Sequence, residues 1–268
     1  MLRTEYKALN RSTPTCFGVP LNFQNVTFFL SLVVQLGTLG LSFASLAMGV
    51  DSQVLTLVLW LETIVQLVEG TWYSIVGCCF TCGKQSVPIF MRYIDWAVTT
   101  PIMLVTLLIF VIWSSDRCAT LGDIRTFPSF GGYVVLIVLM CWLMLLIGLL
   151  YEADWPAFTW LDVVQRVLRK GIDKSIGCGW GLWLGFVPLI VSFVPHTDAY
   201  FRGKTNTGLT AVVVTFVLWV LYGVNAMAAP DVATKNGVYN VLDVFSKNAA
   251  GVVVSIVSMN FNATEAGC

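Results

Sequence analysis

Seven long apolar segments, separated by short polar stretches, dominate the pattern along the chain. They lie at about residues 21–48, 53–77, 87–113, 131–151, 177–195, 208–229 and 236–259. A run of about 20 apolar residues is long enough to cross the hydrocarbon core of a bilayer as a helix. The pattern therefore predicts an all-α membrane protein, in which residues 1–268 form a single seven-transmembrane helix bundle.

The longest connection, residues 152–176, has a different pattern. Between about residues 155 and 170, aromatic, aliphatic and basic side chains alternate at helical spacing. Such a segment is typical of an amphipathic helix that lies in the membrane interface and contacts lipid.

Composition agrees with this interpretation. The chain is 57% hydrophobic and 11% charged, and its formal net charge is zero. These values are typical of a membrane protein, and they give no reason to expect a nucleic-acid partner. The first sixteen residues are polar and basic without an apolar core, so we expect no cleaved signal peptide.

The eight cysteines do not form a recognisable framework. Cys79 and Cys82 make a lone C-x-x-C pair, whereas structural zinc needs four ligands and the only histidine, His196, is distant in sequence. We therefore expect no metal site. Two alternatives remain for the cysteines: apolar packing, or a disulfide that involves Cys16, Cys78, Cys79, Cys82 or Cys178.

Ionisable residues inside the apolar segments point to function, three of them above all. Lys247 and Asp243 are four residues apart, on one face of the last helix, and Asp95 lies in the third. A charge at bilayer depth is costly, so such residues mark functional sites. A lysine near two acids can carry a protonated Schiff base with its counterions. The alternative is a structural ion pair between helices.

The first two helices carry polar stripes. Residues spaced i, i+4, i+7 and i+11 fall within about 60° of one another on a helix and span about 16 Å. The stripes are Ser31, Gln35, Thr38, Ser42 and Ser45 on the first helix, and Glu62, Gln66, Glu69 and Tyr73 on the second. Facing stripes suggest a hydrated path. The alternative is hydrogen bonding between helices, which explains glutamates less well because each is costly in a membrane.

Two motifs resemble those of the microbial (type 1) rhodopsins. The third segment contains Arg92, Tyr93, Asp95, Trp96, Thr99, Thr100 and Pro101 at the family's spacing, and the last contains Asp243 and Lys247. The resemblance implies that Lys247 holds all-trans retinal as a Schiff base inside the bundle. It also implies that Asp95 and Asp243 are the counterions and that Arg92 organises charge on the extracellular side.

The resemblance also predicts a retinal pocket. It implies that Trp96 and Trp219 sandwich the polyene. The other implied contacts are Thr99, Thr100, Met144, Gly148 and Tyr222. Gly223 and Ala226 depart from the usual proline and aromatic residue of the family. We therefore expect a roomier pocket at the ring end.

The sequence favours ion transport and no enzymatic activity. Thr106 lies eleven residues after Asp95, where outward proton pumps often have a carboxylate donor. The run from Asp243 to Asn248 resembles that of algal channelrhodopsins. In those proteins the corresponding asparagine forms a gate with a glutamate and a serine.

The gate of this chain would then consist of Asn248, Glu69 or Glu62, and Ser42 or Thr38. The compact length is similar to that of viral rhodopsins, some of which are cation channels. We therefore expect a light-gated cation channel in a plasma or host-cell membrane, transporting cations or protons. The alternatives are an outward proton pump and a photosensor, and a homo-oligomer stays open.

Membrane orientation has two alternatives. The family's orientation places the N-terminus outside, together with the basic residues of the 152–176 connection. That arrangement opposes the rule that cationic loops stay inside. The inverted orientation would satisfy the rule and would reverse the direction of any pumping.

Overall fold

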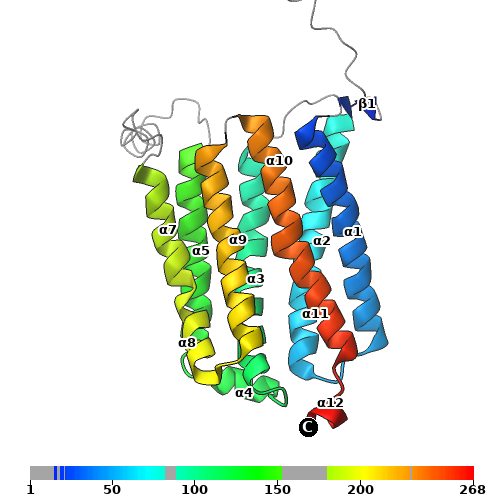
Figure 1. The fold of residues 1–268 in the computed structure, drawn as a ribbon, viewed down its shortest axis with the longest axis vertical. Helices are drawn as coiled ribbons and strands as arrows, with labels where there is room; N and C mark the ends of the chain where they lie inside the picture. The colour runs from blue at the N-terminus through cyan, green and yellow to red at the C-terminus, as the bar shows by residue number, and fades with distance from the viewer. Residues whose placement is uncertain (1–14, 17–18, 21, 82–88, 153–179, 230) are drawn as a thin grey trace, which may run out of the picture.

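The computed structural model describes residues 15–16, 19–20, 22–81, 89–152, 180–229 and 231–268. The predicted interfacial helix at 155–170 lies outside these residues. Seven helical spans run side by side (Figure 1). Their helices are α1 (Phe23–Met48), α2 (Gln53–Thr81), α3 (Ile89–Ser115), α5 (Phe130–Glu152), α7 (Trp180–Ser192), α8 (Val194–Gly203), α9 (Asn206–Ala228), α10 (Val232–Asp243), η2 (Val244–Asn248) and α11 (Ala249–Asn260).

All seven spans are long and apolar enough to cross a membrane, so the predicted fold class is confirmed. Short elements lie at the ends of the bundle. Strands β1 (Thr15–Cys16) and β2 (Val19–Pro20) pair antiparallel, while α4 (Leu121–Thr126) and α12 (Ala263–Ala266) lie at the opposite end (Figure 1).

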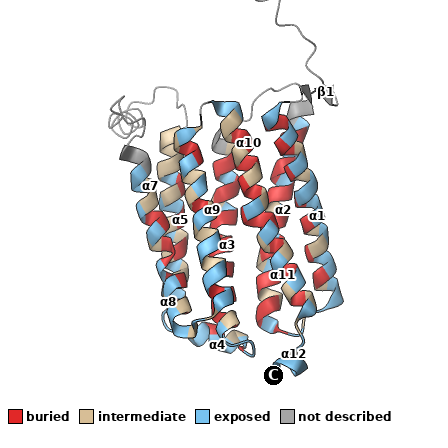
Figure 2. Cartoon of the chain, viewed as in Figure 1, coloured by how far each residue is buried: buried red, intermediate tan, exposed pale blue. Residues whose placement is uncertain are grey.

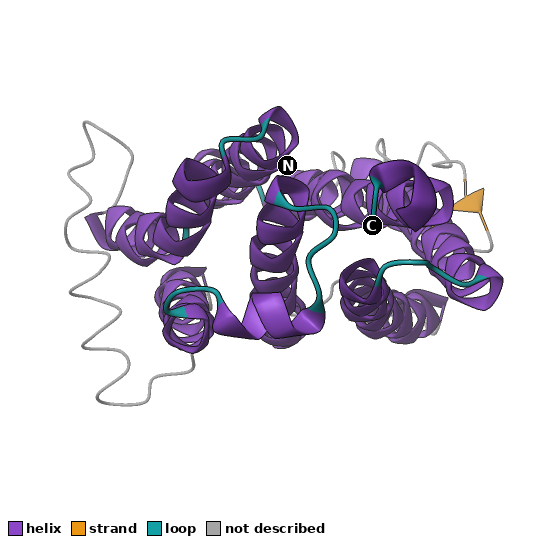
Figure 3. Cartoon of the chain, turned by 90° about the horizontal axis from the view of Figure 1, so that it is seen from below, coloured by secondary structure: helices purple, strands orange, loops and turns teal. Residues whose placement is uncertain are grey.

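The helices form a closed bundle in which each span packs against the next (Figure 3). The seventh span closes the bundle because α10 and α11 pack against α1, and α11 also contacts α2. Helix α3 is central: it packs against α2, α5, α8 and α9. Its residues Leu104, Leu108 and Val111 are completely buried in the main apolar core.

Helix α1 has one buried and one exposed face (Figure 2), and the buried face is polar whereas the exposed face is apolar. Leu30 and Val33 are 61% and 69% exposed, whereas Gln35 and Ser42 are completely buried. In a bilayer this arrangement places the aliphatic side chains in lipid and leaves the polar ones to find partners inside the bundle. The interface of α1 with α2 and the seventh span is therefore polar.

The fifth span continues to Gly203, past the predicted end at residue 195. Several of its polar side chains have partners within the fold. The buried His196 places Nε2 2.8 Å from the Leu104 carbonyl oxygen. Asp198 accepts hydrogen bonds from Arg202 (2.8 Å) and Tyr133 (2.9 Å).

The seventh span begins at Val232, earlier than the predicted 236, because Asp231 caps it. The Asp231 side chain accepts bonds from the Thr234 amide (2.8 Å) and hydroxyl (2.7 Å). The Thr234 hydroxyl and amide hold the pKa of Asp231 below its ordinary value. Further along, the helix widens into the single π-helical turn η2, which contains Lys247. Such turns occur frequently at functional sites.

A disulfide joins Cys118, just after α3, to Cys268 at the end of the sequence. Neither cysteine was among the sequence candidates. The side chains of the candidates Cys16, Cys79, Cys82 and Cys178 lie outside the described residues, so that expectation stays a prediction. The two residues are 150 positions apart. Only the closure of the bundle, which brings the seventh span beside the others, places them together.

Replacing Cys118 by serine is expected to lower the free energy of unfolding by about 2–4 kcal/mol, because the cross-link restricts the unfolded chain. Thermal melting followed by circular dichroism measures the effect. Cys268→Ser should cause the same loss, and the double variant should lose no more than either single one. Alkylation of both thiols in the folded protein without a reductant would contradict this pairing.

Candidate functional site

A buried cluster of charges surrounds the Lys247 amine. Its Nζ lies 2.9 Å from Asp95 Oδ2, 3.0 Å from Glu69 Oε1 and 3.4 Å from Asp243 Oδ1. The three carboxylates come from α3, α2 and α10, and the lysine side chain is only 3% exposed. A buried amine therefore faces acids from three helices. Asp95 and Asp243 are the counterions expected from the sequence, whereas Glu69 was expected in the ion path.

Asp243 is the most heavily bonded of the three acids. Its Oδ2 accepts from Tyr73 (2.8 Å) and Arg92 (3.2 Å), and its Oδ1 accepts from Tyr222 (2.7 Å). By contrast, Asp95 Oδ1 and Glu69 Oε2 are buried without a hydrogen-bond partner in the described part of the chain. Asp243 is thus fixed and screened by donors, whereas Asp95 and Glu69 act mainly on Lys247.

Arg92 joins this cluster to the polar end of the seventh span. Besides Asp243, it donates to the Asn240 side chain and to the Asn236 carbonyl oxygen. Its guanidinium lies over the rings of Trp72 and Tyr239, 5.4 and 5.8 Å from their centroids. The cluster therefore contains two cations and three acids, held together by neutral donors and aromatic faces.

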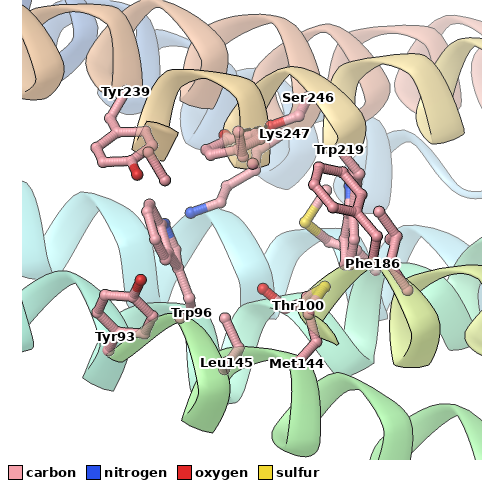
Figure 4. A pocket seen from close by; sticks show the side chains of 17 residues that line it. Tyr93, Trp96, Thr100, Met144, Leu145, Phe186, Trp219, Tyr239, Ser246 and Lys247 are labelled. Atoms are coloured by element: carbon pink, nitrogen blue, oxygen red, sulfur yellow. Dashed lines mark hydrogen bonds between the residues drawn. The ribbon is translucent and has the colours of Figure 1, made fainter. Parts of the chain in front are cut away.

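The lysine side chain enters an apolar cavity between α3, α5, α7, α9 and the seventh span (Figure 4). Six of the residues predicted for the pocket line it: Trp96, Thr100, Met144, Gly148, Trp219 and Tyr222. The predicted Thr99 is not among the lining residues. It is buried, and its hydroxyl donates to the Asp95 carbonyl oxygen at 3.0 Å.

Several lining residues were not expected from the sequence, notably Tyr93, Leu145, Phe186 and Tyr239. Phe186 also corrects the expectation of extra room at Gly223. A Cβ atom on Gly223 would lie 2.5 Å from the Phe186 ring, so this ring occupies the space that a larger residue would take. Helical spacing within α9 could not reveal an aromatic ring contributed by α7.

The cavity suits a conjugated aldehyde. An apolar space with two indoles on its wall accommodates a polyene, and the Lys247 amine at one end can condense with an aldehyde. The carboxylates beside the amine would stabilise a positive charge on the resulting nitrogen. The residues present therefore fit a retinal-type group.

A second polar network lies beside the lysine. Asn248 Nδ2 donates to Gln35 Oε1 (2.7 Å) and Gln66 Oε1 (2.8 Å), and Gln66 Nε2 donates to the Lys247 carbonyl oxygen (3.0 Å). These bonds close the space between α1, α2 and η2. We call Gln35, Gln66 and Asn248 the amide closure.

The amide closure differs from the predicted gate. The Asn248 side chain bonds to Gln35 and Gln66 rather than to Glu62, Glu69, Thr38 or Ser42. Glu69 bonds to Lys247, and the Thr38 hydroxyl donates to the Val34 carbonyl oxygen (2.9 Å) of its own helix. The glutamines replace these residues because they lie at the level of Asn248 in the bundle.

Buried polar atoms without described partners line the same interface. On the N-terminal side of the closure, the Ser31 hydroxyl donates to the Asn240 carbonyl oxygen at 2.9 Å. Within the closure, Gln35 Nε2 and Asn248 Oδ1 have no partner among the described residues. Beyond it, the same holds for Ser42 Oγ, Glu62 Oε2, Ser255 Oγ and Ser258 Oγ. Buried polar groups normally have partners, so this row calls for water or ions.

Thr106, eleven residues after Asp95, is not suited to donate a proton. Thr106 is buried, and its hydroxyl donates to the Ile102 carbonyl oxygen at 2.9 Å. A hydroxyl bonded within its own helix cannot supply a proton to the lysine nitrogen near neutral pH.

Comparison with solved structures shows the same fold in several rhodopsins. Viral rhodopsin OLPVRII is 24% identical, with a TM-score of 0.67 over 90% of this chain and 100% of that chain. The proton pumping rhodopsin AR2 from the marine alga Acetabularia acetabulum is 15% identical, with a TM-score of 0.61 over 89% and 95%. Halorhodopsin, a light-driven chloride pump, is 14% identical, with a TM-score of 0.62 over 90% and 97%.

Comparison with curated protein sequences gives no significant match. The family model of the bacteriorhodopsin-like proteins, however, matches residues 22–260, which include all seven spans. Members of that family bind retinal through a Schiff base. The chain therefore belongs to the bacteriorhodopsin-like family of microbial rhodopsins and is an integral, multi-pass membrane protein.

Proposed function

We propose that the protein is a light-gated cation channel that carries retinal on Lys247. The observation that carries this proposal is the row of unpartnered buried polar atoms between α1, α2 and the seventh span. It continues from the amide closure towards the far end of the bundle. The family includes both pumps and channels, so the choice rests on this chain's own residues.

The residues of the cavity would hold and tune the chromophore. Retinal supplies photoisomerisation. Trp96 and Trp219 limit its movement, while Asp95 and Glu69 stabilise the positive charge at the Lys247 nitrogen. Tyr222 joins two side chains of the seventh span near this nitrogen, because its hydroxyl contacts both Asp243 Oδ1 (2.7 Å) and Ser246 Oγ (2.8 Å).

The amide closure is the proposed gate. Asn248 follows Lys247 directly within the π-helical turn, so a displacement of the lysine must move the asparagine. Loss of its bonds to Gln35 and Gln66 would expose three side-chain amides to water. Water would then reach the buried polar atoms that lack hydrogen-bond partners beyond the closure. A continuous polar path would connect both ends of the bundle.

The charge of the path favours cations. Glu62 lies beyond the closure and Glu69 at the level of Lys247, both at most 3% exposed. Carboxylates that line a pore attract cations and repel anions. Helices α1 and α2 contain no lysine, arginine or histidine. No basic side chain on these two helices therefore offsets the negative charge of the glutamates.

An outward proton pump is the second candidate. The three carboxylates around Lys247 favour it, because an acid at 2.9 Å can accept a proton from the nitrogen. The threonine at position 106 opposes it, since reprotonation would need a different donor. A pump gives current of fixed sign at zero driving force, which separates the two functions.

Lys247→Ala is expected to yield a folded but colourless protein after incubation with retinal, since the variant has no amine at the cavity. Visible absorption measures this outcome. Lys235→Ala is the control and should retain the visible band, because that lysine pairs with Glu152 rather than the central carboxylates. A normal visible band in Lys247→Ala would reject retinal attachment at this residue.

Asp95→Asn and Glu69→Gln should each shift the absorption maximum to the red, because each removes a negative charge about 3 Å from the nitrogen. An anion stabilises the ground state more than the excited state, whose charge has moved along the polyene. Asp243→Asn should have a smaller effect, since donors already screen that carboxylate. Equal maxima in wild type and Asp95→Asn would exclude Asp95 as the dominant counterion, and the larger of the shifts in Glu69→Gln and Asp243→Asn would then identify it.

Light should evoke a current whose reversal potential follows the cation gradient across the membrane of a host cell. Glu62→Gln should change the relative permeability of cations several-fold while the pigment keeps its absorption maximum, because Glu62 lies away from Lys247 along α2. Whole-cell photocurrents at varied sodium and proton concentrations measure both quantities.

Glu265→Gln is the matched control, since it removes an exposed carboxylate outside the spans and should leave selectivity unchanged. An outward current of constant sign across a wide voltage range would replace the channel with the pump. Photocurrents absent under all gradients, together with a slow photocycle, would indicate a photosensor.

A further inference from the structure

Glu152, the last residue of α5, binds three side chains from two other helices. Its Oε2 accepts from the Tyr93 hydroxyl of α3 at 3.0 Å. Its Oε1 accepts from the Tyr239 hydroxyl (2.9 Å) and from Lys235 Nζ (3.0 Å), both of α10. The carboxylate side chain is 1% exposed. A buried carboxylate with charge-assisted bonds on both oxygens holds its partners in a defined geometry.

The two tyrosines carry this geometry to the cavity wall. Tyr93 and Tyr239 contact Trp96 edge to face, with centroid distances of 5.2 and 5.1 Å and interplanar angles of 65° and 82°. All three residues line the cavity (Figure 4). One carboxylate thus sets the spacing of the two rings between which the Trp96 indole lies.

The surrounding contacts leave these rings little freedom. Tyr93 crosses α5 at Gly148, where a Cβ atom would lie 2.8 Å from its hydroxyl oxygen. Tyr239 stacks on Tyr222 at 5.8 Å, and Tyr222 also meets Trp96 edge to face at 5.4 Å. Tyr222 is anchored in the counterion cluster. The other two tyrosines that enclose Trp96 are anchored on Glu152.

We propose that Glu152 is a positioning residue for the chromophore. Through Tyr93 and Tyr239 it fixes the Trp96 indole, and thereby restricts which retinal isomer the cavity accepts and how readily water reaches the lysine linkage. The inference rests on the proposed binding of retinal to Lys247, but not on the choice between channel and pump.

The test compares Glu152→Ala and Glu152→Gln with wild type. The alanine variant should bleach in hydroxylamine in the dark about tenfold faster, because the loss of a bond to a charged group shifts a local equilibrium by about that factor. Its dark isomer composition, read from extracted retinal, should also change. The glutamine variant should lie between, since its amide oxygen keeps one acceptor for the tyrosines.

A matched network provides the control. Tyr133 of α5 donates to Asp198, which also pairs with Arg202, and none of these residues lines the cavity. Tyr133→Phe and Asp198→Asn should lower the melting temperature without changing bleaching or isomer composition. If Glu152→Ala melts earlier but bleaches and isomerises like wild type, Glu152 is only structural and the proposal is overturned.

Two further measurements keep the test decisive. If Glu152→Ala does not fold, Tyr93→Phe and Tyr239→Phe each remove one hydroxyl, and unchanged bleaching in both would overturn the proposal. In the retinal-free protein, the difference in near-ultraviolet circular dichroism between wild type and Trp96→Phe gives the Trp96 signal. This signal should weaken in Glu152→Gln. An unchanged Trp96 signal would overturn the inference, whereas failure of wild type to bind retinal would overturn the proposed function.

Discussion

The structure depends on one buried interaction, the contact of the Lys247 amine with carboxylates from three helices. An ammonium in a low-dielectric interior costs several kcal/mol unless charges and hydrogen bonds compensate it. Asp95, Glu69 and Asp243 provide the charges, and Tyr73, Tyr222 and Arg92 hold Asp243 in place. The relative positions of α2, α3 and the seventh span are therefore fixed around a single nitrogen.

The seven spans and the central acids could be predicted from the sequence, because long apolar runs and isolated charges within them are local features. The stripes of α1 and α2 were also readable from helical spacing. What local patterns could not give was register between helices. Register decides that Glu69 reaches Lys247, that Gln35 and Gln66 reach Asn248, and that Phe186 fills the space beside Gly223.

Errors at the ends of the bundle have a related cause. The polar residues of the fifth span suggested an end at 195, yet Asp198, Arg202 and Tyr133 satisfy one another and the helix continues to Gly203. Likewise, Cys118 and Cys268 come together only when the bundle closes. Pairings between distant segments carry no signal in composition or periodicity.

The π-helical turn explains how isomerisation in the cavity could affect the polar path between α1, α2 and the seventh span, which is separate from the cavity. Lys247 points to the cavity between α3 and α9, while the adjacent Asn248 points to α1 and α2. Gln66 completes the connection because it bonds to both the Asn248 side chain and the Lys247 carbonyl oxygen. A π-helical turn contains one residue more than an α-helical turn. If this turn relaxed towards α-helical geometry, the side chains of Lys247 and Asn248 would rotate together. The amide closure is thus coupled to the lysine by covalent neighbourhood, not by a long relay.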